Sequence, residues 1–256
     1  MSEFRCKQFC IKQDKAAMKV GTDSLILGAW SQIDKLIDLV DSDKNQPLKD
    51  YTLLDIGSGT GLLSLMLAQK TQHAKHRNVI IDAIELDPNG FLQTQSNSMQ
   101  SPWADRINSL ELDFFNLPAR QEYDWAIANP PYFQSDNCQN QQRQLARQLQ
   151  GISWNSWFKQ CANVIKEEGI LELVIPTDIT ETLITAAQFN GFILQARLDI
   201  KSTPVKPAKR TCLRLKKRLY PTPNIQVQQQ TLVIYDSQNQ YTPTYKKLLK
   251  DFYLKF

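Results

Sequence analysis

The run Asn129-Pro130-Pro131-Tyr132 is the part of the sequence whose residue types best suit a chemical reaction. It follows the apolar run 125–128, so it is expected at the end of a buried strand. The side-chain oxygen of Asn129 and the carbonyl oxygen of Pro130 can each accept one N–H of a planar amino group, such as that of adenine. Prolines restrict the backbone, so both acceptors would be preorganised, and the nitrogen lone pair would be directed toward an alkyl donor. The alternative is a strand that ends in a proline turn without chemical function.

Aromatic and basic residues follow this motif. Tyr132 offers a ring face on which a flipped base can stack, worth roughly 1–3 kcal/mol per base, and Phe133 can support it. The glutamine-rich stretch 134–150 carries Arg143 and Arg147 and is interpreted as a lid or substrate loop. These residues are candidate nucleic-acid contacts, although a surface loop without function would look the same. No strong general base is expected, because holding the donor and the acceptor in line is the main contribution.

A glycine-rich turn lies earlier in the chain, between the short apolar run 53–56 and a helical pattern over 62–68. Glycine lets the backbone turn sharply and lets a ligand approach closely. The start of the helix offers free N–H groups and a partial positive charge, which suit a carboxylate such as that of S-adenosylmethionine. The alternative is a tight strand–helix connection, and the glycine spacing differs from the dinucleotide fingerprint. The candidate cofactor residues here are Asp55, Gly57, Ser58, Gly59, Thr60 and Gly61.

Acidic residues end the next two expected strands. Glu85 stands at the tip of the first and can accept hydrogen bonds from a ribose diol, whereas Asp87 is expected to cap a helix that begins at Pro88. Asp113 ends the second strand and can accept from the amino group of the cofactor's adenine, with Phe114 near the ring. An ordinary cap or turn aspartate is the alternative for Asp113. A nicotinamide site is disfavoured, because hydride transfer has no use for the motif at Asn129.

Hydrophobic periodicity indicates an α/β fold. Strands alternate with helices, which predicts a mostly parallel sheet that is covered by helices on both faces and binds ligands beyond the carboxyl ends of its strands. The segment 1–22 is interpreted as an N-terminal arm or hairpin, followed by a helix over 24–40 with Thr22 or Asp23 as its N-cap. The remaining strands are expected at 79–85, 107–112, 125–128, 170–175, 192–200, 211–215 and 231–235, and the remaining helices from 88 and over 154–165, 181–190 and 244–252.

The composition is that of an ordinary globular domain. The chain has 256 residues, of which 42% are hydrophobic and 22% charged, so a single domain over 1–256 is expected. No apolar run approaches the roughly 18–20 residues that cross a bilayer, and no signal peptide is recognised, so the cytoplasm is the expected compartment. The five cysteines are irregularly spaced, and neither a disulfide framework nor a metal site is expected.

Positive charge is concentrated in two segments, although the net charge is only +4. Positions 201–220 contain no Asp or Glu, and a thinner basic stripe runs through Lys7, Lys12, Lys15 and Lys19. Solvated surfaces are the simple alternative, but two basic segments beside a base-modification motif favour contact with a polyanion. The candidate nucleic-acid contacts in the first segment are Lys206, Lys209, Arg210, Arg214, Lys216, Lys217 and Arg218.

Taken with these motifs, the sequence resembles class I methyltransferases of the N6-adenine type, and more narrowly the bacterial tRNA1(Val) (adenine(37)-N6)-methyltransferase family. The resemblance spans nearly the whole chain. Besides the two motifs above, it rests on Lys7-Gln8-Phe9, Met18-Lys19-Val20-Gly21-Thr22-Asp23, Leu27-Gly28-Ala29-Trp30, Leu65-Met66-Leu67-Ala68-Gln69, Ser101-Pro102-Trp103 and Asp251-Phe252-Tyr253-Leu254.

The resemblance implies a Rossmann-like, seven-stranded, mostly parallel sheet, S-adenosylmethionine as cofactor, no metal, and a tRNA substrate methylated on the amino group of the adenine beside the anticodon. Such an adenine is already unpaired, so extruding it costs less than opening a duplex. Gly21, Thr22 and Asp23 match a family segment expected near the cofactor's methionine end. One departure is Gln148-Leu149 after Arg147, where the family commonly carries an aromatic residue or His and then Thr.

Two kinds of alternative remain open. The planar amino group could belong to DNA adenine, to a guanine of ribosomal RNA or to a protein glutamine. The basic segments argue against a protein substrate, and no separate DNA-recognition domain is evident. The chain could instead be a non-catalytic RNA-binding protein on the same scaffold. Against this second alternative, the glycine turn, Glu85 and Asn129 are all present.

Overall fold

An eight-stranded sheet runs through the computed structural model, which describes residues 3–16, 19–35, 37, 50–74, 78–130, 153–218 and 226–256. The strand order is β10-β8-β9-β7-β6-β3-β4-β5. All neighbouring strands are parallel except that β9 runs antiparallel to both β7 and β8. The strands are β3 (Tyr51–Ile56), β4 (Val79–Glu85), β5 (Ile107–Glu111), β6 (Tyr123–Ala128), β7 (Ile165–Pro176), β8 (Phe192–Lys201), β9 (Arg210–Lys217) and β10 (Gln228–Val233).

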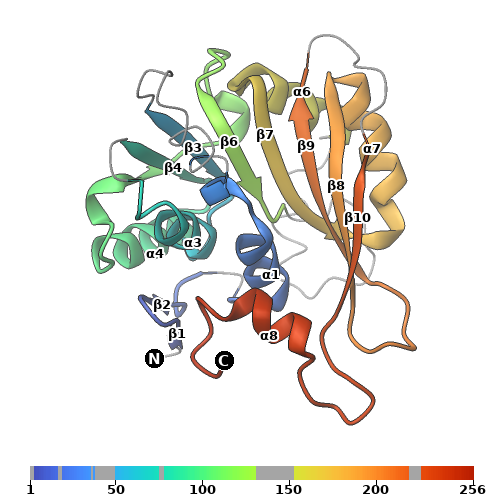
Figure 1. Cartoon of the computed structure of the whole chain (residues 1–256). Coiled ribbons are helices and arrows are strands. Elements are labelled where there is room, and N and C mark those ends of the chain that lie inside the picture. Colours follow the sequence, from blue (N-terminus) through green and yellow to red (C-terminus); the bar gives the residue numbers. More distant parts are fainter. Residues whose placement is uncertain are drawn as a thin grey trace.

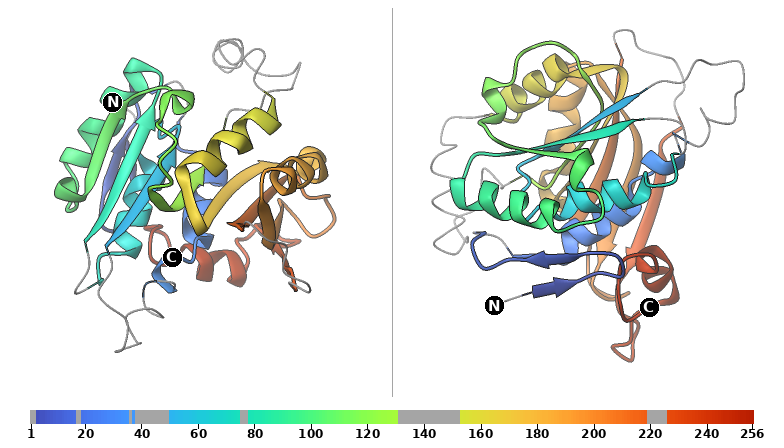
Figure 2. Two further views of the ribbon diagram at one scale, coloured as in Figure 1. Left: turned by 90° about the horizontal axis from the view of Figure 1, so that it is seen from above. Right: turned by 90° about the vertical axis from the view of Figure 1, so that its left-hand side faces the viewer.

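Helices cover both faces of this sheet (Figure 1, Figure 2). One core cluster joins α1, α3, α8 and the sheet, and a second lies between the sheet and the pair α6 and α7. None of the helices in the described part of the chain is long and apolar enough to cross a membrane. The helices are α1 (Thr22–Trp30), α3 (Leu62–Lys70), α4 (Pro88–Met99), α6 (Trp154–Val164), α7 (Thr180–Phe189) and α8 (Pro243–Leu249), with short 3-10 turns at η1 (Ala104–Arg106), η2 (Phe114–Asn116) and η3 (Thr177–Ile179).

The order of the strands reverses between β3 and β6. The chain passes from β3 through β4 to β5 in one direction, and then returns to place β6 on the other side of β3. In open α/β sheets, ligands bind at such a reversal, outside the carboxyl ends of the strands. The fold therefore points to the tips of β3 and β6 as the place to look for a site.

The predicted α/β class and the mostly parallel sheet are confirmed. The sheet has eight strands, one more than the family resemblance implied. The additional strand, β10, is the one that the sequence pattern predicts at 231–235, and it pairs in parallel with β8 at the edge of the sheet. Strand β7 begins at Ile165 rather than at 170, since its first residues include Lys166 and Glu167, whose charges hide the strand pattern. Glu168, with φ 65°, also interrupts the extended backbone there.

The first predicted helix is shorter than expected and begins earlier. Helix α1 ends at Trp30, and the backbone becomes helical again at 33–35. Its N-cap is Gly21, in an extended conformation with φ −108° and ψ 155°, and no side chain caps it. The prediction of Thr22 or Asp23 as the cap is therefore wrong. The Asp23 carboxylate instead pairs with Arg210, 2.7 Å away.

Both ends of the chain lie on the same side of the molecule, near α8 (Figure 1). Strands β1 (Glu3–Arg5) and β2 (Cys10–Lys12) form an antiparallel hairpin. The backbone N–H of Lys7 donates to the carbonyl of Phe252 over 2.9 Å, and its ammonium donates to the carbonyl of Phe256 over 2.6 Å. These contacts hold the hairpin, with its lysines, beside the C-terminal segment.

Candidate active site

The two motifs singled out in the sequence meet at the carboxyl ends of β3 and β6. The strands are parallel neighbours, and Ile56 pairs in register with Ala128. The residue after Ile56 is Gly57, and the residue after Ala128 is Asn129. The glycine turn and the candidate amine acceptor therefore begin side by side, one strand spacing apart, at the strand-order reversal.

The glycine turn needs its glycines for two different reasons. Gly57, Gly59 and Gly61 have φ of 73°, 56° and 78°, a region that residues with a Cβ rarely adopt. A Cβ added at Gly57 or Gly59 would meet nothing within 4 Å, whereas one at Gly61 would lie 3.2 Å from Thr94. The first two glycines thus leave open space where a ligand can approach, and the third lets α4 pack closely.

Ser58 and Thr60 connect this turn to helix α4. The Ser58 hydroxyl lies 3.0 Å from that of Thr94, and Thr60 is buried, with its carbonyl accepting from Asn97. Both contacts tie the turn to α4. Sequence reasoning grouped Ser58 and Thr60 with the cofactor residues, and the structure shows that the Ser58 side chain and the Thr60 backbone carbonyl hold the turn.

Asp55 anchors the helix that follows the turn. One of its oxygens, Oδ2, accepts from the backbone N–H and the hydroxyl of Ser64 over 3.0 and 2.6 Å. The other, Oδ1, is buried without a hydrogen-bond partner. Burial raises the pKa of Asp55 to about 7, with a contribution from Glu85, while the Ser64 hydrogen bonds oppose the shift. This buried oxygen, close in the chain to the glycine turn, has unused capacity to accept one further hydrogen bond.

The raised pKa leads to a prediction about stability. The folded-state pKa of Asp55 lies above the ordinary 3.8, so between about pH 4 and 7 the carboxyl is protonated in the folded protein but ionised in the unfolded chain. The free energy of unfolding therefore falls as pH rises through that window. Each pH unit removes at most about 1.4 kcal/mol. Asp55→Asn mimics the uncharged form, so we expect it to gain stability relative to wild type from pH 5 to pH 8. Urea unfolding of both proteins checks this, and parallel pH profiles would contradict it.

Glu85 holds the turn from the neighbouring strand. Its Oε2 accepts from the backbone N–H of Gly59 over 2.8 Å, and its Oε1 accepts from that of Asp87 over 2.9 Å. The side chain is buried, and this burial raises its pKa, although the backbone hydrogen bonds oppose the shift. Each oxygen keeps a lone pair for a further donor such as a ribose hydroxyl. Asp87 caps α4 by accepting from Gly90, as predicted.

Gly90 is a site residue that sequence reasoning missed. A Cβ there would lie 2.9 Å from the Glu85 Cγ. The first turn of α4 therefore carries a glycine so that the Glu85 side chain fits against it. A signal was present in the sequence, because a glycine inside a helical pattern often marks a close approach.

Asp113 and Phe114 lie at the end of β5. The Asp113 Oδ1 accepts from the backbone N–H of Phe115 over 3.0 Å, and Asp113 is the N-cap of the turn η2. One of its two oxygens thus has the role of an ordinary turn aspartate. Phe114 is buried in the second core cluster and packs at 5.8 Å from the Trp157 ring. These contacts fix the turn that follows β5, the strand beside β4.

Asn129 contacts the first turn of α1. Its Nδ2 donates to the hydroxyl of Ser24 over 2.8 Å. This contact brings Gly21, Thr22 and Asp23, which precede Ser24, to the same edge as the glycine turn. Sequence reasoning missed Ser24, although it follows directly on the segment expected near the cofactor. Pro130 is the last described residue of its motif, and Pro131, Tyr132, Phe133, the stretch 134–150, Arg143 and Arg147 lie outside the described residues.

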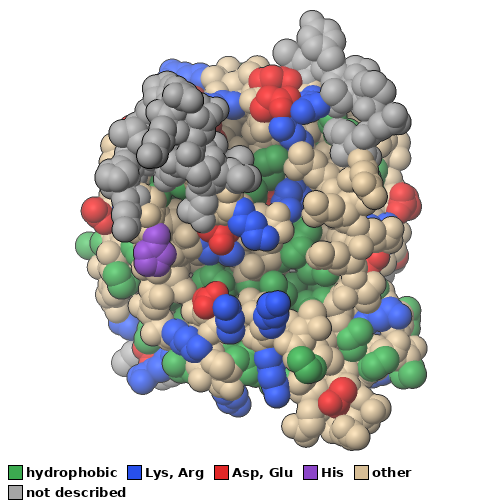
Figure 3. All heavy atoms as spheres, viewed as in Figure 1, with side chains coloured by type: hydrophobic (Ala, Val, Ile, Leu, Met, Phe, Trp, Pro, Cys, Tyr) green, Lys and Arg blue, Asp and Glu red, His purple; other side chains and the backbone are tan. Residues whose placement is uncertain are grey.

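The antiparallel direction of β9 divides the basic segment into two groups. Arg210 pairs in register with Pro176 at the carboxyl end of β7, whereas Lys216 pairs with Ile170, toward the opposite edge. Lys206 and Lys209 therefore lie at the edge that carries the site, and both are exposed. Lys and Arg side chains border a central hollow on the face shown in Figure 3.

The second group lies at the opposite edge and has acidic partners. The Lys216 ammonium is 2.6 Å from one Glu168 oxygen, and the Arg218 guanidinium is 2.9 Å from the other. These ion pairs lower the pKa of Glu168. The position of Lys216 and Arg218 does not support a shared nucleic-acid surface with Lys206 and Lys209.

Two residues of the basic segment are buried, and the prediction that they contact nucleic acid is wrong. The Arg214 Nε donates to Glu172 over 2.7 Å, and its guanidinium lies 4.5 Å from the centre of the Trp30 ring. The Lys217 Nζ donates to the carbonyl of Ile165 over 2.8 Å, and burial lowers its pKa. Strand β9 lies between β7 and β8, so its side chains point into the layers on either face of the sheet.

Comparison with known proteins agrees with this architecture. Residues 29–196 match the family described as methyltransferase small domain. A tRNA1(Val) (adenine(37)-N6)-methyltransferase of Haemophilus influenzae (strain PittGG) is 40% identical, over 100% of both chains. One from Trichodesmium erythraeum (strain IMS101) is 34% identical, over 100% of this chain and 99% of the relative. The chain belongs to this methyltransferase family.

Solved structures support the fold of this family member. A predicted O-methyltransferase from Agrobacterium tumefaciens superposes with a TM-score of 0.61 and 16% identity, over 90% of this chain and 96% of the other. TYW2 of M. jannaschii, solved in complex with AdoMet, superposes with a TM-score of 0.50 and 13% identity, over 85% and 86% of the two chains. At these sequence identities, the structural similarity shows a methyltransferase fold but does not identify the substrate.

Proposed function

We propose that this protein transfers a methyl group from S-adenosylmethionine to the exocyclic N6 of adenine 37, beside the anticodon of tRNA1(Val). The observation that carries the proposal is the register of β3 and β6, which starts the glycine turn and Asn129 side by side. The printed names of relatives such as the Haemophilus influenzae protein support the choice of tRNA and of this adenine. The cytoplasm, where tRNA acts, is the proposed compartment.

The residues at the edge of the sheet fit the cofactor. Gly57 and Gly59 leave open space in the turn, and the Oδ1 of Asp55, the residue two positions before Gly57, is buried without a hydrogen-bond partner. Glu85 keeps acceptor capacity for a ribose, and the first turn of α1 after Gly21 offers N–H groups to a carboxylate. S-adenosylmethionine supplies an electrophilic methyl group on a sulfonium when it is bound. We propose no metal.

The protein's contribution to the reaction is to hold the amine. The Asn129 Oδ1 and the Pro130 carbonyl each accept one N–H of the adenine amino group, and Tyr132 stacks on the base. With both protons held, the nitrogen lone pair would point at the methyl carbon of bound S-adenosylmethionine, and the methyl group would pass to the nitrogen and leave S-adenosylhomocysteine. The resulting ammonium is acidic and releases its proton to water, so no strong base is required. Catalysis then rests on alignment and preorganised acceptors.

The direct test is a labelling experiment with total cellular RNA. The purified protein is incubated with S-adenosylmethionine labelled in its methyl group, and the labelled RNA is digested to nucleosides. We expect label in N6-methyladenosine from tRNA. Label in a guanosine, or methylation of DNA or protein instead of RNA, would replace the proposed substrate with one of the alternatives. A protein without measurable affinity for S-adenosylmethionine would be an RNA-binding module on this scaffold.

The division of the basic segment predicts which lysines contact RNA. Lys206→Ala with Lys209→Ala removes two exposed charges at the edge that carries the site. We expect this pair of changes to weaken tRNA binding about tenfold and to lower the slope of log K against log salt by about 1.4 to 1.8, the loss of two phosphate contacts. Titration of tRNA at several salt concentrations measures both quantities.

The matched control removes the same charge from the opposite edge. Lys216→Ala with Arg218→Ala also deletes two positive charges, but these residues pair with Glu168 away from the site. We expect tRNA affinity and salt slope to stay within about twofold of wild type. Equal weakening by both pairs of changes would show that net charge, rather than a surface at this edge, governs binding.

A further inference from the structure

The hydrogen bond between Ser24 and Asn129 links two segments that are 105 positions apart in the chain. The Asn129 Nδ2 donates and the Ser24 hydroxyl oxygen accepts, over 2.8 Å. We infer that Ser24 is a positioning residue for methyl transfer: it holds the Asn129 amide in the orientation that offers Oδ1 to the substrate amine. This inference rests on the proposed function, in which Asn129 accepts an N–H of adenine.

The orientation of this amide matters because its two ends have opposite hydrogen-bonding character. The oxygen accepts, and the NH2 group donates. The terminal torsion of asparagine is roughly two-fold, so the two orientations have nearly the same shape. An amide turned the wrong way would present its NH2 to the amino group of adenine, and two donors would face each other. In the structure, the Ser24 hydroxyl accepts from Nδ2, which directs Nδ2 to Ser24 and leaves Oδ1 for the substrate amine.

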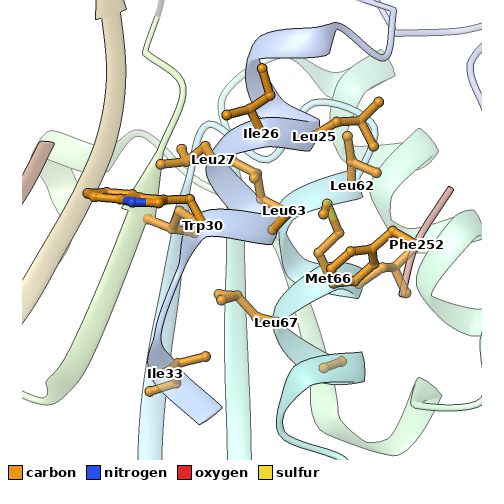
Figure 4. Close-up of a cluster of buried hydrophobic side chains, with 14 of the residues drawn as sticks. Leu25, Ile26, Leu27, Trp30, Ile33, Leu62, Leu63, Met66, Leu67 and Phe252 are labelled. Atoms are coloured by element: carbon orange, nitrogen blue, oxygen red, sulfur yellow. The ribbon is translucent and has the colours of Figure 1, made fainter. Parts of the chain in front are cut away.

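Ser24 belongs to a helix that is held firmly in place. It lies in the first turn of α1, and the residues that follow it, from Leu25 to Trp30, are all buried. Close-packed contacts hold this helix, since a Cβ at Gly28 would lie 2.6 Å from the sulfur of Met66. Figure 4 shows the side chains of α1 packed against those of α3.

A second contact holds the same turn of α1. Asp23 accepts from the Nε of Arg210 over 2.7 Å, which ties the start of α1 to the start of β9. Helix α3, against which α1 packs, begins directly after the glycine turn. The packing of α1 on α3 therefore positions both the Ser24 hydroxyl and the glycine turn. Through its hydrogen bond, Ser24 holds Asn129 in a defined place relative to that turn.

The kinetic test compares Ser24→Ala with Ser24→Thr. Single-turnover methylation of tRNA is measured for each, together with the equilibrium affinities for S-adenosylmethionine and tRNA. We expect Ser24→Ala to slow the single-turnover rate about two- to tenfold, the range of one ordinary hydrogen bond, with both affinities unchanged. Ser24→Thr keeps the hydroxyl and is expected to restore the rate to within about twofold of wild type.

Several outcomes would overturn the inference. A Ser24→Ala enzyme as fast as wild type, or one altered only in its affinities, would show that the hydroxyl does not align the amide. A threonine variant as slow as the alanine variant would show that the hydroxyl is not the active feature. If wild type methylates no adenine at all, the proposed function fails instead, and a second measurement still decides the role of Ser24.

That second measurement is independent of activity. In a ¹⁵N-labelled sample, the side-chain amide signals of Asn129 are assigned by their loss in Asn129→Asp. Hydrogen-bonded amide protons resonate downfield and exchange slowly with solvent. We expect Ser24→Ala to move these signals upfield and speed their exchange, and Ser24→Thr to leave them near their wild-type positions. Signals that do not respond to Ser24→Ala would contradict the contact itself.

Discussion

Replacing Asn129 by alanine is expected to lower the rate of methyl transfer about 10²- to 10³-fold, while the affinity for S-adenosylmethionine stays nearly unchanged. The size follows from losing one preorganised hydrogen-bond acceptor that acts on the reacting group. Cofactor affinity is spared because Glu85 and the glycine turn, which are held by β3 and β4, are expected to carry most of the cofactor contacts. Single-turnover kinetics and a cofactor titration separate the two effects.

Asn129→Asp is the control for this prediction. The carboxylate keeps an oxygen that can accept the substrate N–H but loses the Nδ2 donor that contacts Ser24. We expect its rate to fall between those of wild type and Asn129→Ala. A near-normal rate in Asn129→Ala would remove the assigned role, and an equal loss of cofactor affinity would place the residue in the cofactor site instead.

Replacing Glu85 by alanine is expected to have the reverse effect and to weaken S-adenosylmethionine binding about 10²-fold. The change removes the proposed ribose acceptor. It also leaves the N–H groups of Gly59 and Asp87 without the carboxylate that now holds them. Hydrogen bonds to charged groups are worth about 1.5–3 kcal/mol each, so the loss of one or two gives this magnitude. Isothermal titration with the cofactor measures it directly.

The neighbouring strand provides a matched control. Glu111 pairs in register with Glu85 at the tip of β5, and it is exposed. Glu111→Ala removes the same side chain one strand away from the proposed ribose contact, and we expect cofactor affinity within about twofold of wild type. If saturating cofactor does not restore part of the Glu85→Ala rate, Glu85 has a role beyond binding.

Local sequence patterns determined most of the fold. Strand β4 begins and ends as predicted, and α3 and α4 begin at the predicted residues, because alternating apolar residues, a proline at the first helical position and glycines in turns act over a few neighbouring residues. The same reasoning identified Asp87 as a cap. The end of α1 and the start of β7 were misjudged, since charged and polar residues there are compatible with more than one local structure.

The sequence by itself also predicted the chemistry that we propose for the site, because the glycine turn and the asparagine–proline motif are each formed by adjacent residues. Only the tertiary structure decided which side chains surround them. Arg214 and Lys217 look like the less buried basic residues of the same segment, but the central position of β9 buries them. Charge is a property of a residue, whereas burial depends on the strands and helices packed around it.

The contact between Ser24 and Asn129 is the clearest example of a feature that only the tertiary structure reveals. Nothing local in either segment predicts it, because the two residues meet only when α1 packs on α3 and β6 pairs with β3. The direction of β9 is of the same kind, since it separates Lys206 and Lys209 from Lys216 and Arg218 although all four lie in one basic segment. Both follow from pairings between distant parts of the chain, which no local pattern of residues specifies.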